Sequence, residues 1–141
     1  MSNEELACKL PCQDLMVNIA WALDRNAADE AADLFAEDGV LESAEGHVSG
    51  PALRAALKKR SPDITTHHIL SNMYVRPLDA TNAEARAYVM VYRAPTLPDT
   101  LPRPMPATPG GAGLWQMRFR KTPQGWRISR MAMAPKLAPK A

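Results

Sequence analysis

Asp24 is a carboxylate placed on the apolar side of a helical pattern. At about 100° per residue, positions 11–26 form one continuous apolar arc. The arc consists of Leu15, Met16, Val17, Ile19, Ala20, Trp21 and Leu23. Asp24 projects between Val17 and Ala20, whereas Asp14, Asn18 and Arg25 cluster on the opposite, polar face. A carboxylate in such an arc needs a partner, because an unpaired buried charge is costly.

His68, in the stretch TTHHILSN, is the partner that we expect. A histidine titrates near neutral pH and can share a proton with a carboxylate. In such a pair Asp24 would fix the imidazole tautomer and stabilise its protonated form, leaving the other ring nitrogen free to accept a proton. The alternative is structural: Asp24 could belong to the C-terminal turn of its helix or cap the helix that follows.

His67 and His68 are neighbours on a predicted strand, so their side chains point to opposite faces and cannot hold one metal ion together. Strand alternation places Leu70, Asn72 and Tyr74 on the face of His68. We therefore expect Asn72 or Tyr74 to contact a ligand of this site. For Tyr74, cross-strand packing is an alternative role.

Other residues are candidates for an apolar pocket around the pair. They are Val17 and Trp21 on the helix, and Trp115, Met117 and Phe119, which alternate onto one face of a strand. Ordinary core packing would explain them equally well. Arg130 shares the strand face of Trp126 and Ile128, which suggests an anionic partner inside the protein. Tyr88, Met90 and Tyr92 share one face of another strand and suggest a pocket or a subunit contact.

Composition indicates one folded domain. The chain has 141 residues, 46% of them hydrophobic, with 17 Lys and Arg against 15 Asp and Glu. This balance and the scattered basic residues argue against nucleic acid as a partner. The N-terminal stretch lacks the pattern of a signal peptide or a membrane span, so we expect no membrane association and a cytoplasmic location. Cys8 and Cys12 are the only cysteines, and we expect them to be reduced and structural.

The pattern predicts three helices followed by strands. The first helix ends near Asn26. The second begins at a capping box over 26–29, contains AADEAADLF and ends at Gly39, and the third begins at Gly50-Pro51. Five strands are expected, over 40–43, 66–76, 83–94, 113–121 and 126–134. Helices packed on a mainly antiparallel sheet make an α+β domain, which we place at 1–134.

Two segments lie outside this regular pattern. The first is a Pro-rich hairpin loop over 94–113, from which Leu101 and Met105 could reach inward. It could be a lid or a partly ordered insertion. The second is a flexible tail over 135–141, predicted from its composition.

The succession NIAWALDRNAADEAADLFAEDGVLES, GHVSGPALRAAL, TTHHILSNMYV, ARAYVMVYR and GLWQMRFRKTPQGWRISRM resembles the SnoaL-like family of the nuclear transport factor 2-like superfamily. The resemblance covers about residues 15–131. It implies a cone: a curved mixed sheet around a long helix, with an apolar pocket. It also implies that Asp24 and His68 form the catalytic pair known from scytalone dehydratase and bile-acid 7α-dehydratase. The tyrosines of some members are replaced here by Trp21 and Leu23.

These observations lead to two functional hypotheses. The first is a cofactor-independent lyase or isomerase without a metal, in which His68 removes a proton from a small hydrophobic cyclic substrate. Dehydration, isomerisation and elimination all share this step. The second is a non-catalytic ligand-binding or oligomerisation domain of the same fold. Under both hypotheses we expect a homodimer or homotrimer, because the open side of such a sheet needs covering.

Overall fold

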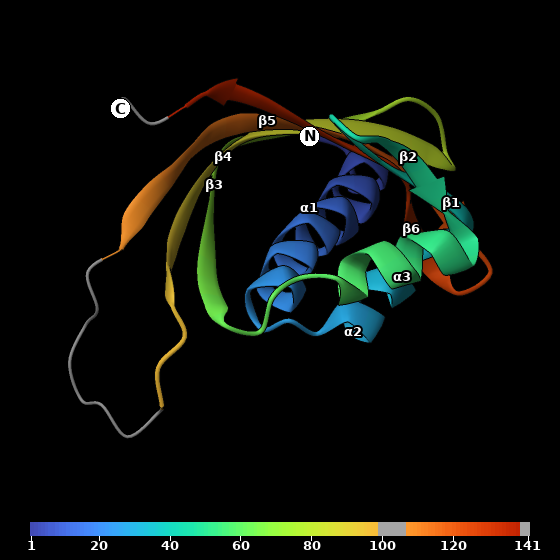
Figure 1. Cartoon of the computed structure of the whole chain (residues 1–141). Coiled ribbons are helices and arrows are strands. Elements are labelled where there is room, and N and C mark those ends of the chain that lie inside the picture. Colours follow the sequence, from blue (N-terminus) through green and yellow to red (C-terminus); the bar gives the residue numbers. More distant parts are fainter. Residues whose placement is uncertain (99–106, 139–141) are drawn as a thin grey trace.

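The structure, a computed structural model, describes residues 1–98 and 107–138. Within these residues the chain forms three helices and six strands (Figure 1). The helices are α1 (Asn3–Asp24), α2 (Ala28–Asp33) and α3 (Gly50–Lys58). The strands are β1 (Phe35–Ser43), β2 (Gly46–Ser49), β3 (Ile64–Pro77), β4 (Asn82–Pro95), β5 (Thr108–Thr122) and β6 (Gly125–Leu137). None of the helices in the described part is long and apolar enough to span a membrane.

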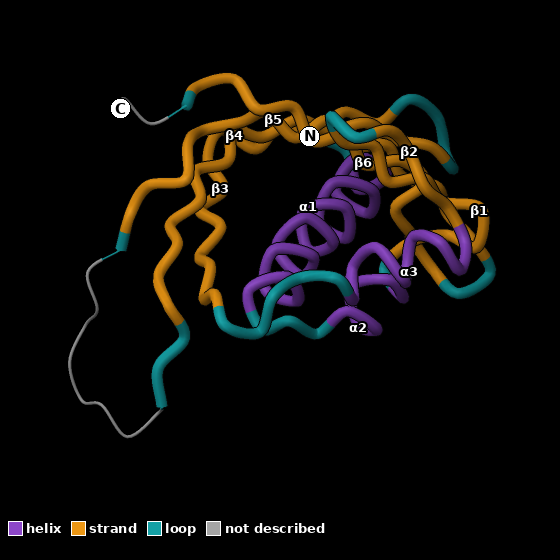
Figure 2. Tube along the Cα trace, in the orientation of Figure 1, coloured by secondary structure: helices purple, strands orange, loops and turns teal. Residues whose placement is uncertain are grey.

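The strands form one sheet in the order β2-β1-β6-β5-β4-β3. β1 and β6 are parallel, and the other neighbouring strands are antiparallel. The sheet curves around α1, while α2 and α3 lie beside it below β1 and β2 (Figure 2). The expected α+β cone with a mixed, mostly antiparallel sheet is therefore confirmed.

The first helix begins eight residues earlier than the apolar arc alone predicts. Ser2 and Glu5 form a capping box, in which Ser2 Oγ accepts from the Glu5 N–H at 3.1 Å and Glu5 Oε2 accepts from the Ser2 N–H at 2.8 Å. Pro11 lies inside α1 instead of starting it. The added turns bring Cys8 into the core, where both Cys8 and Cys12 are free and buried.

The second helix is shorter than predicted, and Gly39 does not end it. α2 stops at Asp33, and Gly39 lies inside β1. A Cβ atom at Gly39 would be only 2.8 Å from the Ile128 carbonyl oxygen, so glycine is required there for the close approach of β1 to β6. The predicted capping box over 26–29 is also wrong, because Ala27 is the N-cap of α2 and no side chain caps it.

The long strands extend into both segments expected to be irregular. β4 continues to Pro95 and β5 starts at Thr108, which leaves 96–107 between them instead of 94–113. β6 continues to Leu137, because the first residues of β5 supply it with a partner, as in the pairing of Ala112 with Leu137. Leu101 and Met105, and the tail residues 139–141, lie outside the described residues.

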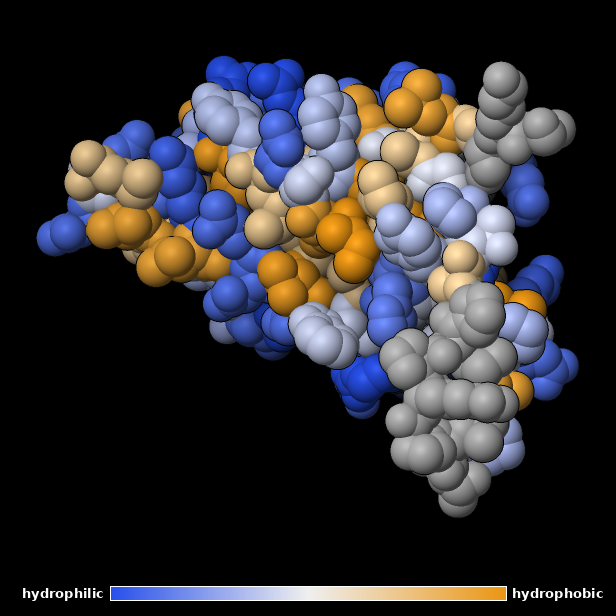
Figure 3. All heavy atoms as spheres, turned by 90° about the vertical axis from the view of Figure 1, so that its left-hand side faces the viewer, coloured by the Kyte–Doolittle hydropathy of each residue, from blue (hydrophilic) through white to orange (hydrophobic). Residues whose placement is uncertain are grey.

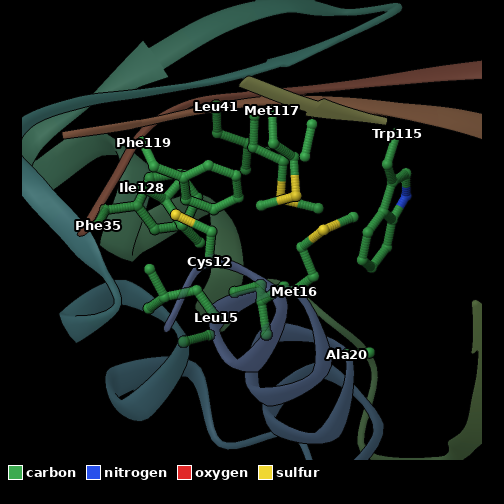
Figure 4. Packing of buried hydrophobic residues seen from close by; sticks show 14 of the residues in the cluster. Cys12, Leu15, Met16, Ala20, Phe35, Leu41, Trp115, Met117, Phe119 and Ile128 are labelled. Carbon is green, nitrogen blue, oxygen red and sulfur yellow. The ribbon is translucent and has the colours of Figure 1, made fainter. Parts of the chain in front are cut away.

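The core fills the space between α1 and the inner face of the sheet (Figure 4). Its largest fully buried side chains are Met16, Ile19, Cys12, Phe119, Ile128 and Met131. β4 turns small side chains inward, namely Ala83, Ala85, Ala87 and Val89. Small residues on this strand leave room for the long helix inside the curve of the sheet.

Candidate functional site

Asp24 and His68 meet inside the cone. Asp24 is the last residue of α1, and His68 lies in β3. The His68 Nδ1 atom is 2.5 Å from Asp24 Oδ1. The same carboxylate accepts the His68 backbone N–H, at 3.2 Å from Oδ1 and 3.0 Å from Oδ2, and the Thr66 hydroxyl at 3.0 Å. Three donors on β3 thus hold one carboxylate at the end of α1.

Local structure explains why Asp24 is available for this contact. The backbone N–H groups at the end of α1 bond within the chain, from Arg25 to Trp21 and from Asn26 to Leu23. No side chain caps α2, so Asp24 does not serve the helix that follows. Thr66 and His68 are on the inner face of β3, two residues apart, whereas His67 is exposed. Thr66 is the only polar or charged residue in the buried class among the described residues.

The environment of His68 keeps its imidazole neutral. Its side chain is 8% exposed, and that of Asp24 is 14% exposed. Burial lowers the pKa of His68 below its ordinary value, the hydrogen bond and charge of Asp24 oppose this, and the positive charges of Arg60 and Arg93 add to the lowering. Because Asp24 is an acceptor, Nδ1 carries the proton in the neutral ring. The lone pair is then on Nε2, the atom that a general base would use.

Two hollows touch His68. The first, which we call the inner cavity, has a volume of about 400 Å³ and lies between α1, α3 and the strands β1, β2 and β6. Its apolar walls are formed by Ile19, Leu23, Phe35, Leu41, Met131 and Met133, and Arg60 and His68 also line it. The second, the edge groove, has a volume of about 450 Å³ and runs between α1 and the edge strand β3.

Val17 and Trp21 line the edge groove together with Asp24 and His68. Trp21 is 62% exposed, so it forms the rim of this groove and is not part of the core. Trp115 and Met117 are 3% and 2% exposed and belong to the core, and neither lines the inner cavity or the edge groove. Trp115 nevertheless supports the site, because its ring centroid is 5.7 Å from that of His68.

Asn72 and Tyr74 are not on the face of His68, which corrects the prediction from strand alternation. Ser71 pairs with Tyr88, and Tyr74 pairs with Arg86. Between these two pairs β3 therefore has one more residue than β4. This bulge contains Asn72, whose φ of 52° is in the left-handed region. It reverses the alternation, so that Met73 lies inside, Asn72 is exposed, and Tyr74 is 53% exposed against Arg86.

Arg130 is also on the outer surface, and a bulge explains this as well. Arg118 pairs with Arg130 but Phe119 pairs with Ile128, so β6 has one extra residue there. Ile128 faces the core, whereas Arg130 is exposed and donates to Glu42 of β1 at 3.1 and 2.5 Å. Its partner is therefore a surface carboxylate of this chain, and the idea of an inward-facing Arg130 is wrong.

Arg60 is the residue that our sequence reasoning missed. It follows α3, lines the inner cavity with His68, and donates from Nη2 to Thr66 Oγ1 at 3.1 Å. In the sequence it is adjacent to Lys58 and Lys59, and such a basic run is typical of a solvated surface. The helical spacing contained a signal, because Leu53, Leu57 and Arg60 follow the i, i+4, i+7 pattern of a single face.

These features define the class: an α+β cone of the nuclear transport factor 2-like kind, with a buried Asp-His pair beside an apolar cavity. The model of the SnoaL-like domain matches residues 4–132, so the chain belongs to this family. No curated protein shows significant sequence similarity to the chain.

Solved structures share the fold. A protein named "Putative Scytalone Dehydratase" from Novosphingobium aromaticivorans has a TM-score of 0.82 and 20% identity, covering 100% of this chain and 92% of its own. Hexachlorocyclohexane dehydrochlorinase LinA-type3 from Novosphingobium barchaimii has a TM-score of 0.78 and 15% identity. The alignment covers 98% of the present chain and 93% of the dehydrochlorinase. An NTF2-like protein with a cystatin-like fold from Novosphingobium aromaticivorans has a TM-score of 0.71 and 22% identity. The alignment covers 95% of the present chain and 90% of that protein. At these identities the likeness shows the fold alone.

Proposed function

We propose that this protein is a cofactor-independent lyase or isomerase in which His68 is the general base and Asp24 orients it. The observation that carries the proposal is the 2.5 Å contact between His68 Nδ1 and Asp24 Oδ1, next to a cavity that His68 also lines. A histidine whose pKa is lowered by burial is deprotonated at neutral pH and ready to accept a proton.

The chemical step begins when His68 Nε2 takes a proton from a carbon of the substrate. The electrons of the broken C–H bond move toward an adjacent carbonyl or expel a leaving group. Asp24 stabilises the imidazolium that forms, because its carboxylate already accepts the Nδ1 proton. In an elimination the leaving group departs with its electron pair, and in an isomerisation the imidazolium returns the proton to another carbon.

The inner cavity supports a small hydrophobic cyclic substrate. Its volume of about 400 Å³ is within the range of pockets that hold small molecules, and most of its walls are apolar. Leu23, at a position where some relatives place a tyrosine, is buried and lines this cavity, so it offers no hydroxyl to a leaving group. A substrate whose own carbonyl stabilises the negative charge after proton removal would have less need of a hydroxyl group that assists a leaving group.

Proton abstraction can be tested before the natural substrate is identified. A panel of small cyclic ketones is incubated with the protein in D2O, and NMR measures the exchange of protons next to the carbonyl. We expect the wild-type protein to accelerate exchange of at least one ketone, and both His68→Gln and Asp24→Asn to reduce the rate by about 10²-fold or more. His67→Gln is the matched control, since His67 is exposed on the opposite face of β3. Ketones that bind without exchanging would favour the non-catalytic binding domain.

We also propose that the protein is a homodimer or homotrimer whose contact includes the outer face of β3 and β4. Tyr88, Met90 and Tyr92 on β4 are 58%, 42% and 37% exposed, and Ile69, the cross-strand neighbour of Met90, is 50% exposed. Apolar side chains are also visible among charged ones on the face shown in Figure 3. Light scattering after size exclusion should show two or three copies, and Met90→Glu should shift the mass to one copy. A monomeric wild-type protein would contradict this proposal.

A further inference from the structure

Arg60 is a partly buried cation in the wall of the inner cavity. The chain leaves α3 at Lys58, and two residues later the Arg60 side chain turns toward the sheet. Its Nη2 atom donates to Thr66 Oγ1 at 3.1 Å, and Thr66 in turn donates to Asp24. Arg60 and His68 line the same cavity. The Thr66 hydroxyl thus connects the guanidinium to Asp24, the carboxylate that contacts the proposed base.

This guanidinium has no anion as a direct partner among the described residues. Its Nε atom is buried and has no hydrogen-bond acceptor there. The charge of Asp24 acts on Arg60, but the two oxygens of Asp24 accept from Thr66 and His68. By contrast, exposed arginines of the chain do form ion pairs with carboxylates, namely Arg25, Arg54, Arg76, Arg120 and Arg130.

The surroundings of Arg60 favour an added negative charge. Burial lowers the pKa of Arg60, the charge of Arg93 acts in the same direction, and Asp24 opposes it only in part. Lys59 also lines the inner cavity, where Glu45 is the one acidic residue of the described lining. A guanidinium with free donors in such a place suits a carboxylate, which it can hold by charge-assisted hydrogen bonds.

We infer that Arg60 binds a carboxylate group of the ligand in the inner cavity. The substrate class then narrows from small hydrophobic ring compounds to ring compounds that carry a carboxylate. Arg60 is a binding residue in this inference and takes no proton, while the apolar walls contact the ring. The inference rests on the proposed function, because it assigns a chemical group to the substrate of the same site.

Benzoate and benzamide make a suitable pair of probes, since they share ring and size but only benzoate is charged at neutral pH. Each is titrated into the full-length protein while NMR follows the imidazole signals of His68 and yields the dissociation constant. The variants are Arg60→Gln, Arg60→Lys and, as the matched control, Arg86→Gln. Arg86 is exposed on the outer face of β4, so its replacement removes the same charge away from the cavity. Thermal unfolding confirms that each variant is folded.

We expect the wild-type protein to bind benzoate at least about tenfold more tightly than benzamide, as is usual for a hydrogen-bonded ion pair. Arg60→Gln should abolish this preference, Arg60→Lys should keep part of it, and Arg86→Gln should keep all of it. Equal binding of both probes to wild type, or an unchanged preference in Arg60→Gln, would overturn the inference. If the preference for benzoate is unchanged in Arg60→Gln, Arg60 does not bind the carboxylate and its positive charge serves only to offset the negative charge of Asp24.

The same variants separate this inference from the proposed function. If Arg60→Gln loses the preference for benzoate while wild type exchanges no ketone protons, the carboxylate site stands and the enzyme hypothesis fails. If wild type exchanges ketone protons but does not prefer benzoate, the enzyme hypothesis stands and Arg60 has no role in ligand choice.

Discussion

His68 is held twice by Asp24. Its backbone N–H donates to Asp24 Oδ2 at 3.0 Å, and its ring Nδ1 lies 2.5 Å from Asp24 Oδ1. One carboxylate therefore fixes the main chain and the imidazole of the same residue, and connects the end of α1 to β3. This double contact means that replacing Asp24 should change both the titration of the ring and the position of the strand.

Asp24→Asn should lower the pKa of His68 further. In the wild-type protein burial already lowers this pKa, and the Asp24 carboxylate is the main influence that raises it. An amide keeps the shape but removes the negative charge, so that only the lowering influences remain. An NMR titration of the His68 imidazole measures the effect, with Asp14→Asn on the exposed face of α1 as the control. A His68 pKa that is unchanged or raised in Asp24→Asn would show that the pair is not coupled.

His68 should also make the protein less stable as the pH falls. Its pKa is below the ordinary value of 6.5 in the folded protein, so the unfolded chain takes up the proton first. Well above pH 6.5 His68 is neutral in both the folded and the unfolded protein, so it makes no contribution to the pH dependence of stability. As the pH falls from 6.5 toward the folded pKa, protonation favours the unfolded chain and stability is lost.

Urea unfolding above and below this pH tests the expectation. The loss of unfolding free energy between the two conditions should be smaller in His68→Gln than in wild type, because glutamine does not titrate. The control His67→Gln removes an exposed histidine and should behave like wild type. An equal pH dependence in wild type and His68→Gln would contradict the prediction.

Thr66→Val should weaken the site with little change of shape. Its hydroxyl donates to Asp24 at 3.0 Å and accepts from Arg60 at 3.1 Å, and the residue is 6% exposed. Valine leaves both partners short of a hydrogen bond, and we expect a loss of about 1–3 kcal/mol in the free energy of unfolding. Thr65→Val is the matched control, because the Thr65 hydroxyl contacts only Thr96 at an exposed position. Urea unfolding should separate the two variants, and equal stabilities would count against the role of Thr66.

Much of the fold can be predicted from the periodicity of apolar residues in the sequence. The candidate site can be predicted from a single carboxylate, Asp24, on the apolar side of a helix. Three helices and the long strands could be predicted because apolar spacing depends on local sequence. The inward direction of His68 was implied by the family resemblance, since strand alternation alone leaves either His67 or His68 facing inward. Asp24 stood out because a carboxylate in an apolar arc needs a partner. Arg60 does not stand out in this way: helical spacing places it on the face of Leu53 and Leu57, but its contact with Thr66 depends on how the chain continues after α3 ends at Lys58.

The errors in the site share one physical cause, which is the β-bulge. Counting every second residue along a strand predicts that Asn72, Tyr74 and Arg130 lie on the inner face. A single extra residue reverses that count, and it does so near Asn72 in β3 and before Arg130 in β6. Gly39 has a related explanation: local sequence predicts a helix end there, but its role depends on the close approach of Ile128 in β6.

The bulge at Asn72 leads to a last prediction. Asn72 has a φ of 52°, a conformation that asparagine and glycine tolerate and that a β-branched residue does not. Asn72→Val should therefore reduce the free energy of unfolding by about 1–2 kcal/mol, whereas Asn72→Gly should stay within about 0.5 kcal/mol of wild type. Asn72 is exposed, so lost packing does not complicate the comparison. Urea unfolding of the two variants decides it: if valine and glycine are equally tolerated, β3 can pair without the bulge, and the side chains of Asn72 and Tyr74 are free to turn toward His68.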